Sequence, residues 1–274
     1  MHKDLSKFGI LGKSAVMQGL AEKVSAAAPH WDSILLTGER GTGKELLAKA
    51  VHLLGPTRGA SPVIIDCATL HTATVEATLF GYERGAFTGA VHRKIGFLEA
   101  AHQGTVFLDE ISSLPLEAQG RLLRFLEEQT INRIGALTSI RIKTRIISAT
   151  NRDLAVDMAN GAFLPDLYDR LSVLNIESPP LRNRHGDLPM LLDHFIGADE
   201  RTRFTKDCIK FLNEHPFYGN VRELRNLCRR LRVFHPKGRI DRNIVQKLLQ
   251  TETKQSEISV MRSKDACEFS SYSG

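Results

Sequence analysis

The sequence predicts an α/β fold in which a parallel sheet is flanked by helices, followed by a smaller all-helical domain. Short apolar runs alternate with helical patterns over most of the chain, and a glycine-rich turn separates the first run from a helix. The strand pattern stops at Pro179 and Pro180. We therefore place the α/β core at residues 1–178, the helical domain at 179–250 and a flexible, polar tail at 251–274.

The predicted strands are continuous apolar runs, as expected of parallel strands that are buried on both faces. They lie at residues 33–37, 62–66, 104–110, 144–150 and 173–177. Helical patterns fill the connections at residues 43–54, 95–102, 115–128 and 153–160. After the two prolines only amphipathic segments follow, at residues 187–197, 205–214, 219–234 and 240–250.

The composition is that of a globular protein of 274 residues, with 42% hydrophobic and 25% charged residues. No apolar run approaches the roughly 20 residues of a membrane span, and the N-terminus lacks a secretory signal pattern, so we expect a cytoplasmic protein without a membrane partner. No Cys-x-x-Cys pair occurs, which argues against a zinc site or a disulfide framework among Cys67, Cys208, Cys228 and Cys267.

The formal net charge of +6 is unevenly distributed. Residues 201–254 contain 14 Lys and Arg against 5 Asp and Glu, a local charge of +9, so the remainder sums to about −3. Such a region can attract nucleic acid, or its arginines can simply lie on solvated helix faces. The sequence leaves both interpretations open.

The glycine-rich turn in SILLTGERGTGKELLAKAV indicates a phosphate site. Its glycines let backbone N–H groups surround phosphate oxygens, and the following helix N-terminus adds positive potential. Lys44 would reach the β- and γ-phosphates, although the general pattern has Ser or Thr where this chain has Glu45. The predicted nucleotide contacts are Gly38, Glu39, Arg40, Gly41, Thr42, Gly43, Lys44 and Glu45.

Two other strands end in polar side chains. GTVFLDEI ends in Asp109, which can hold Mg²⁺ directly or through water, and Glu110, which can polarise the attacking water. RIISATNRDL ends in Thr150 and Asn151, which can sense the γ-phosphate or position the water. Either of these could instead cap the next helix, a role that Asp153 could also fill.

Two arginines could stabilise charge during phosphoryl transfer. Arg170 lies in LPDLYDRLSV and Arg222 in YGNVRELRN. Lone arginines are more often surface residues, so the residue type alone does not decide their role.

The segment FGYERGAFTGA places Phe87 and Thr88 between Gly85 and Gly89. Because glycine weakens regular structure, the segment predicts a tight loop with Phe87 near its tip. Burial preferences alone would instead predict that the Phe87 ring is buried in the core.

Taken together, these motifs make the chain resemble the AAA+ domain of bacterial enhancer-binding proteins, the ATPases that activate sigma-54 RNA polymerase. The resemblance covers roughly residues 8–250 and depends on GERGTGKE, LFGYERGAFTGA, GTVFLDEI, LPLEAQGRLLRFLEE, SATNRDL, PPLRNRHGDLP and GNVRELRN. It implies an AAA+ P-loop NTPase core with a helical lid. It also implies a Mg²⁺-dependent ATPase that remodels sigma-54 RNA polymerase holoenzyme for promoter opening, working as a ring, usually a hexamer.

The resemblance also implies roles for individual residues. The loop at about 81–94 would contact sigma-54 through Phe87 and Thr88, so we expect Phe87 to be exposed. ATP would lie at each subunit boundary. The remaining implied roles are ATP binding by Thr42, Gly43 and Lys44, Mg²⁺ and water chemistry at Asp109 and Glu110, a first sensor at Thr150 and Asn151, a second sensor at Arg222, and an arginine finger at Arg170.

Two departures from the family pattern bear on activity. Leu164 stands where members commonly carry a second arginine, six residues before the finger. Asp66 stands where members usually have Asn, whose amide holds the catalytic glutamate. An ionised carboxylate cannot donate that hydrogen bond, so we expect an altered switch or uncoupled hydrolysis. Both departures favour an alternative, an ATP-binding, weakly or non-hydrolysing subunit of a ring mixed with a paralogue.

The expected organisation also differs from typical members. The chain starts close to the ATPase domain, and the polar tail is too short for a helix-turn-helix, so we expect neither a receiver nor a DNA-binding domain. DNA contact would then be indirect or non-specific. A general AAA+ DNA translocase is the third interpretation, and it leaves the GAFTGA segment unexplained.

Overall fold

The computed structural model describes residues 4–250. Five parallel strands form the central sheet in the order β2-β5-β8-β1-β9. They are β1 (Ile34–Thr37), β2 (Val63–Asp66), β5 (Thr105–Asp109), β8 (Arg145–Thr150) and β9 (Leu174–Glu177). Each predicted strand is thus confirmed to within one residue at either end.

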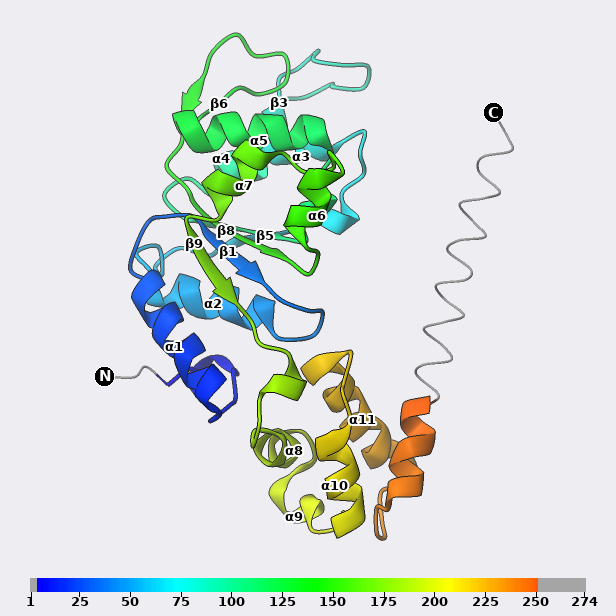
Figure 1. Cartoon of the computed structure of the whole chain (residues 1–274). Coiled ribbons are helices and arrows are strands. Elements are labelled where there is room, and N and C mark those ends of the chain that lie inside the picture. Colours follow the sequence, from blue (N-terminus) through cyan, green and yellow to red (C-terminus); the bar gives the residue numbers. More distant parts are fainter. Residues whose placement is uncertain (1–3, 251–274) are drawn as a thin grey trace. The chain divides into compact units, whose positions relative to one another are not determined.

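Helices cover both faces of this sheet (Figure 1). On one face, α1 (Ala15–Ala27) and α2 (Lys44–Leu54) pack against apolar residues of β1, β8 and β9. The helices that enclose the core on the other face are α3 (Val75–Phe80), α4 (Phe97–Ala100), α5 (Leu116–Glu128), α6 (Leu154–Ala159) and α7 (Pro165–Leu171). The sequence analysis did not predict α1, α3 or α7. Short 3-10 turns are η1 (Ser6–Phe8), η2 (Cys67–Thr69), η3 (Ile111–Ser113) and η4 (Leu181–Asn183).

A buried arginine fastens the first two helices to the sheet. Arg145 begins β8 and is fully buried, and its guanidinium donates to Ala27 O at 3.4 Å and to Val51 O at 3.3 Å. These carbonyls lie in the last turns of α1 and α2, which carry partial negative charge. Burial lowers the pKa of Arg145 to about 10. A side chain at Gly55 would collide with this guanidinium, since a Cβ there would lie 2.2 Å from Nη1.

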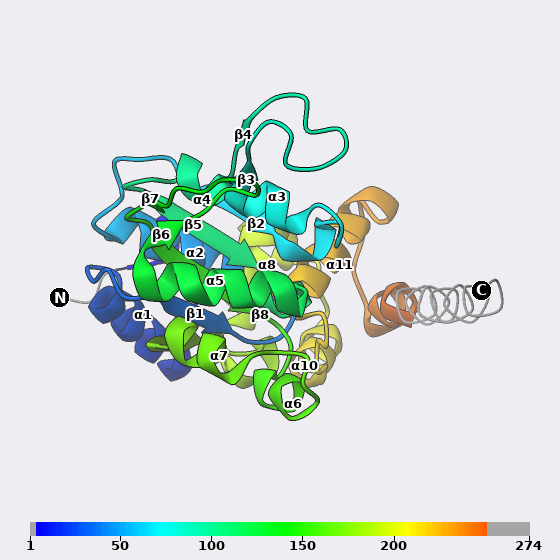
Figure 2. The ribbon, with the colours of Figure 1, turned by 90° about the horizontal axis from the view of Figure 1, so that it is seen from above.

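Two small hairpins project from this unit side by side (Figures 1 and 2). One is formed by β3 (Gly81–Tyr82) and β4 (Lys94–Ile95), and the other by β6 (Thr130–Ile131) and β7 (Ile140–Arg141). Backbone hydrogen bonds join them, from Glu83 N to Ile134 O and from Ile134 N to Gly81 O, both 2.9 Å. The sequence analysis predicted the first as a loop and missed the second.

The chain divides into two compact units between Arg184 and His185. The described part of the second unit is helical, as predicted, with α8 (Leu188–Ile196), α9 (Ala198–Arg201), α10 (Lys206–Glu214), α11 (Asn220–Phe234) and a last helix over residues 242–250. The predicted tail at 251–274 lies outside the described residues. Within residues 4–250, no helix combines the length and the apolar character that crossing a bilayer requires.

Candidate nucleotide site and partner loop

The glycine-rich turn between β1 and α2 has the backbone conformation of a phosphate-binding loop. Gly38, Gly41 and Gly43 all have positive φ, at 136°, 78° and 102°. Gly38 also lies close to β9, because a Cβ there would be 2.6 Å from Ser178 O. The side chain of Lys44 folds back over the turn, and its Nζ donates to Gly38 O at 2.8 Å. Other side chains are strained at positive φ, so the glycines are needed for this shape.

Carboxylates meet at the neighbouring ends of β2 and β5. Asp66 and Asp109 are directly paired in the strand register, and Glu110 follows with a left-handed φ of 49° that a non-glycine residue rarely adopts. Burial is the main cause that raises the pKa of Asp109, and the charges of Glu110 and Asp66 raise it further. This edge of the sheet therefore favours a cation.

The donor chemistry of this edge fits Mg²⁺ held together with nucleotide phosphates. Mg²⁺ in nucleotide sites is usually bound by one or two carboxylates, with phosphates and water completing the shell. Among the described residues, no group of three or more His, Cys, Asp or Glu side chains could hold a metal by itself. Asp109 is the half-buried carboxylate best placed for this role, with Asp66 beside it in the register.

Replacing Asp109 should stabilise the nucleotide-free protein. The folded-state pKa of Asp109 is raised, so its ionised form costs stability at neutral pH, and this cost disappears as pH falls towards the unfolded-state pKa. Asp109→Asn should therefore raise Tm by a few degrees at pH 7 and by less near pH 4. Differential scanning calorimetry at both pH values checks this, and an unchanged or lower Tm at pH 7 contradicts it.

Glu110 is held from β8. In the amide orientation that satisfies both side chains, the Asn151 nitrogen donates to Glu110 Oε2 at 2.6 Å. The Asn151 backbone N–H lies 3.4 Å from the same oxygen. Asp66 instead accepts a hydrogen bond from Ala68 N at 3.0 Å. The hydrogen bonds that hold Glu110 therefore come from Asn151.

The neighbouring Thr150 is buried, and its hydroxyl lies 3.0 Å from Ser112 Oγ. It also accepts from Arg152 N at 3.1 Å. Asp153, and neither Thr150 nor Asn151, caps α6 by accepting from Ala155 N at 2.9 Å. Thr150 thus links the end of β8 to η3, which follows Glu110.

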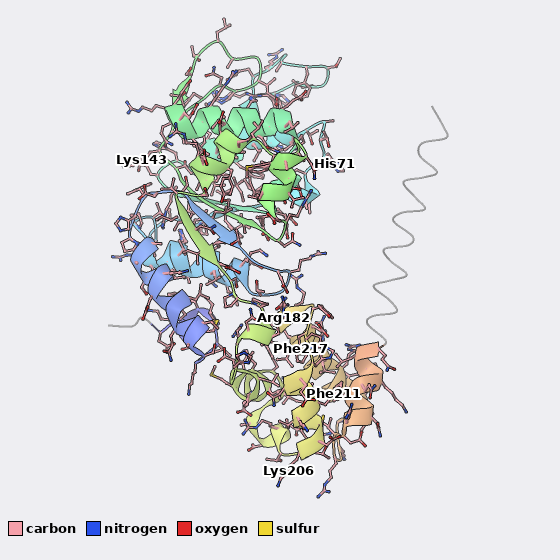
Figure 3. All side chains as sticks on the ribbon, in the orientation of Figure 1. His71, Lys143, Arg182, Lys206, Phe211 and Phe217 are labelled. Atoms are coloured by element: carbon pink, nitrogen blue, oxygen red, sulfur yellow. The ribbon has the colours of Figure 1, made fainter. Side chains whose placement is uncertain are left out.

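An ion pair that the sequence analysis missed holds the glycine-rich turn. Arg182 of η4 donates to both carboxylate oxygens of Glu39, at 2.8 and 2.5 Å (Figure 3 labels Arg182). The paired residues are 143 positions apart, so no local pattern connects them. Among the other predicted contacts, Thr42 Oγ donates to Glu39 O at 2.9 Å, and the side chains of Arg40 and Glu45 are exposed.

The loop between β3 and β4 presents an apolar side chain to solvent. Phe87 is 46% exposed and makes an edge contact with Tyr82, with ring centroids 5.0 Å apart. Thr88 is exposed, and both Gly85 and Gly89 have positive φ with open space around them. The exposure expected of Phe87 is observed.

The base of this loop is fixed by Arg133 from the adjacent hairpin. The Arg133 side chain is 8% exposed and binds Glu83 and Glu99 with N–O distances of 2.5 Å to each. These hydrogen bonds, to Glu99 above all, raise the pKa of Arg133 and lower that of Glu99. A Cβ at Gly135 would lie 2.9 Å from the Ala86 Cβ, so the two hairpins also touch.

Removing Arg133 should destabilise this base. Arg133→Ala leaves two half-buried carboxylates facing each other and should cost about 2 kcal/mol. Arg93→Ala is the matched control, because Arg93 faces the same glutamates at 3.9 Å but is 52% exposed. Urea denaturation measures both variants. Equal losses of unfolding free energy would contradict the assignment.

Arg170 and Leu164 lie at α7, whereas Arg222 lies in the second unit. Arg170 on α7 is 57% exposed, and among residues 4–250 its one ion pair is a 3.4 Å contact with Glu127. Leu164 packs against the core, and its N–H donates to Gln119 Oε1 at 2.9 Å. Arg222 lies on α11 in the second unit with its side chain exposed, so its sensor role stays a prediction.

Comparison with known families agrees with this geometry. A family model described as the sigma-54 interaction domain matches residues 10–177. The chain belongs to this family. A second model, the AAA+ ATPase lid domain, matches residues 182–260 of the chain. Its parallel sheet, glycine-rich turn and helical second unit are those of an AAA+ P-loop NTPase.

Individual relatives are consistent with this membership. The chain is 41% identical over 254 residues to the DNA-binding transcriptional regulator NtrC of Rhizobium meliloti, covering 91% of this chain and 52% of the relative. It is 42% identical over 231 residues to the transcriptional regulatory protein ZraR of Escherichia coli, covering 82% and 52%. The structure of NtrX from Brucella abortus in complex with ADP matches with a TM-score of 0.78 and 32% identity, covering 86% and 55%. The chain spans about half the length of the curated relatives it matches.

Proposed function

We propose that this protein is an ATP-hydrolysing transcriptional activator that remodels sigma-54 RNA polymerase holoenzyme so that the promoter can open. One observation supports it most: the unit that carries the phosphate-binding turn and the Asp109–Glu110 pair also presents the exposed loop with Phe87 and Thr88. A nucleotide site alone would fit any P-loop NTPase. An exposed apolar loop tip on the same unit also fits a protein partner.

Each residue of the site has a defined chemical task in this proposal. The N–H groups of the glycine-rich turn and the Lys44 ammonium hold and neutralise the ATP phosphates. Asp109 holds Mg²⁺, which supplies charge neutralisation at the phosphates when bound. Glu110 accepts a proton from the attacking water, and Asn151 keeps its carboxylate in one orientation.

Hydrolysis in this proposal depends on a second copy of the chain. Arg170 is exposed and only weakly paired in its own subunit, so it is free to reach a neighbour's phosphates. ATP then lies at the boundaries of a ring, which we propose to be a hexamer. Arg222 contributes as the second sensor.

The loop is the element that converts hydrolysis into work. Phe87 and Thr88 lie on a segment bracketed by two open glycines, and its base is rigidly held by Arg133. A flexible tip on a fixed base can exchange between two positions, and nucleotide state biases that exchange. The tip contacts sigma-54.

A second candidate function is a weakly hydrolysing subunit of a mixed ring with a paralogue. Leu164 supports it, because its side chain is committed to the core and cannot supply a second guanidinium. Asp66 supports an altered switch in either candidate, because its ionised carboxylate cannot hold Glu110 by donating a hydrogen bond.

Restoring the amide at position 66 tests how far Asp66 alters the switch. Asp66→Asn places a second amide donor next to Asp109 and Glu110, so we expect a severalfold lower basal ATPase rate and a larger relative response to sigma-54. Steady-state phosphate release with and without sigma-54 measures both. If neither quantity changes, Asp66 has no part in the switch.

The decisive experiment measures the ATPase rate over a range of protein concentrations, with and without sigma-54 holoenzyme. The activator predicts a specific rate that rises with protein concentration and binding to sigma-54 in the presence of a transition-state nucleotide analogue. Thr88→Ala should abolish that binding and leave basal hydrolysis intact. No turnover by the chain alone, with turnover restored by a paralogue, would favour the mixed ring.

A further inference from the structure

The outward face of α11 carries a row of arginines. The helix buries Asn220, Leu224, Leu227, Cys228 and Leu231. Apart from Arg222, its exposed positions include Arg225, Arg229 and Arg232, which we call the α11 arginine row. Spacings of four and three residues place all three on one side of a helix, the side opposite the buried residues.

In the described part of the chain, no acidic side chain forms an ion pair with this row. Glu223 is the one acidic residue of α11, and its carboxylate is turned away into a hydrogen bond with Gly219 N at 2.7 Å and a contact with His215 Nε2 at 3.0 Å. The sequence from residue 224 to 240 contains no Asp or Glu, and it adds exposed Lys237 and Arg239 just after the helix.

Two other arginines of the second unit have acidic partners, whereas the first two arginines of the row have none among residues 4–250. Arg201 pairs with Asp193, and Arg203 pairs with Glu200. The side chains of Arg225 and Arg229 make no hydrogen bond or ion pair with any residue between 4 and 250. Two neighbouring guanidinium groups on successive turns are thus left for an external anion.

We propose that the α11 arginine row binds the phosphate backbone of duplex DNA. The guanidinium fork matches phosphate oxygens in pairs, and every cation of α11 is an arginine. A protein partner would be expected to meet an apolar centre, but the exposed large apolar residues of this segment, Tyr218, Val233 and Phe234, lie towards its two ends. A helix fits the major groove of B-form DNA, whereas the deep groove of A-form RNA is too narrow.

The test measures binding of the full chain to a labelled DNA duplex of random sequence by fluorescence anisotropy at several salt concentrations. Each phosphate contact contributes about −0.9 to the slope of log K against log salt. Arg225→Gln/Arg229→Gln should therefore make the slope shallower by about 2 and weaken low-salt binding roughly tenfold or more. Duplex RNA and polyglutamate serve as the competing ligands.

Lys206→Gln/Lys210→Gln is the matched control. Both lysines are exposed on α10 of the same unit, and their replacement changes the net charge equally (Figure 3 labels Lys206). This variant should keep nearly the wild-type slope. Equal effects of the two double variants, or preferential binding of polyglutamate or duplex RNA, would overturn the inference.

The ATPase rate separates this inference from the proposed function. Neither double variant alters a residue of the nucleotide site, so both should hydrolyse ATP at the wild-type rate. Loss of DNA binding with normal hydrolysis supports the arginine row. Normal sigma-54-stimulated hydrolysis without any salt-dependent DNA binding would contradict DNA binding by the α11 arginine row. The proposed activator function would be unaffected by that result.

Discussion

Glu110→Gln should reduce ATP hydrolysis by about a hundredfold to ten-thousandfold while nucleotide binding is retained, because the variant loses the group that accepts a proton from water. The replacement is close to isosteric and still accepts the hydrogen bond from Asn151, so the surroundings of the side chain should be preserved. Phosphate release measures the rate, and fluorescent ATP binding measures the affinity.

Asn151→Ala is the informative companion variant. It leaves the Glu110 carboxylate in place and removes the amide that orients it, so the rate should change by less than in Glu110→Gln. If Glu110→Gln hydrolyses ATP at the wild-type rate, the proton acceptor lies elsewhere. If its ATP affinity collapses instead, the residue acts in binding and not in the chemical step.

Arg170→Ala should lower the ATPase rate of the assembled protein by about a thousandfold or more, because an arginine finger neutralises charge that develops in the transition state. The side chain is exposed and its ion pair with Glu127 is long, so its removal should barely affect folding. Circular dichroism melting checks the folding, and phosphate release checks the rate.

Mixing two inactive variants shows whether the finger acts across a subunit boundary. Arg170→Ala subunits keep Glu110, and Glu110→Gln subunits keep Arg170, so a boundary between them can hold one complete site. We expect the mixture to regain activity. The control mixes Arg170→Ala with Glu110→Gln/Arg170→Ala, which cannot complete a site. Activity in the control, or none in the first mixture, contradicts a finger in trans.

The sequence by itself determined the strands and the phosphate-binding turn. The five core strands are unbroken apolar runs, and Gly38, Gly41 and Gly43 lie at positions whose positive φ the turn requires. The carboxyl ends of parallel strands share one edge of a sheet, which is why Asp66 and Asp109 could be expected to lie together. These features depend on local backbone geometry and on the rule that the carboxyl ends of parallel strands lie at the same edge of a sheet.

Weakly periodic or short elements escaped prediction. α3 has six residues and each strand of the small hairpins has two, which is too few to show a clear period. Their existence depends on contacts with the rest of the unit. The hairpin at β6 and β7, for example, is fixed by hydrogen bonds to the segment near Glu83.

Only the tertiary structure decided which polar groups are partners. Asn151 and Glu110 are 41 positions apart, Arg133 and Glu83 are 50 apart, and Arg182 and Glu39 are 143 apart. Hydrogen bonds and ion pairs act over a few ångströms, and the chain path sets which distant residues come within that range. The residue types therefore indicated which chemistry the site could perform. The packing of the chain determined that Asn151 is the residue that holds Glu110.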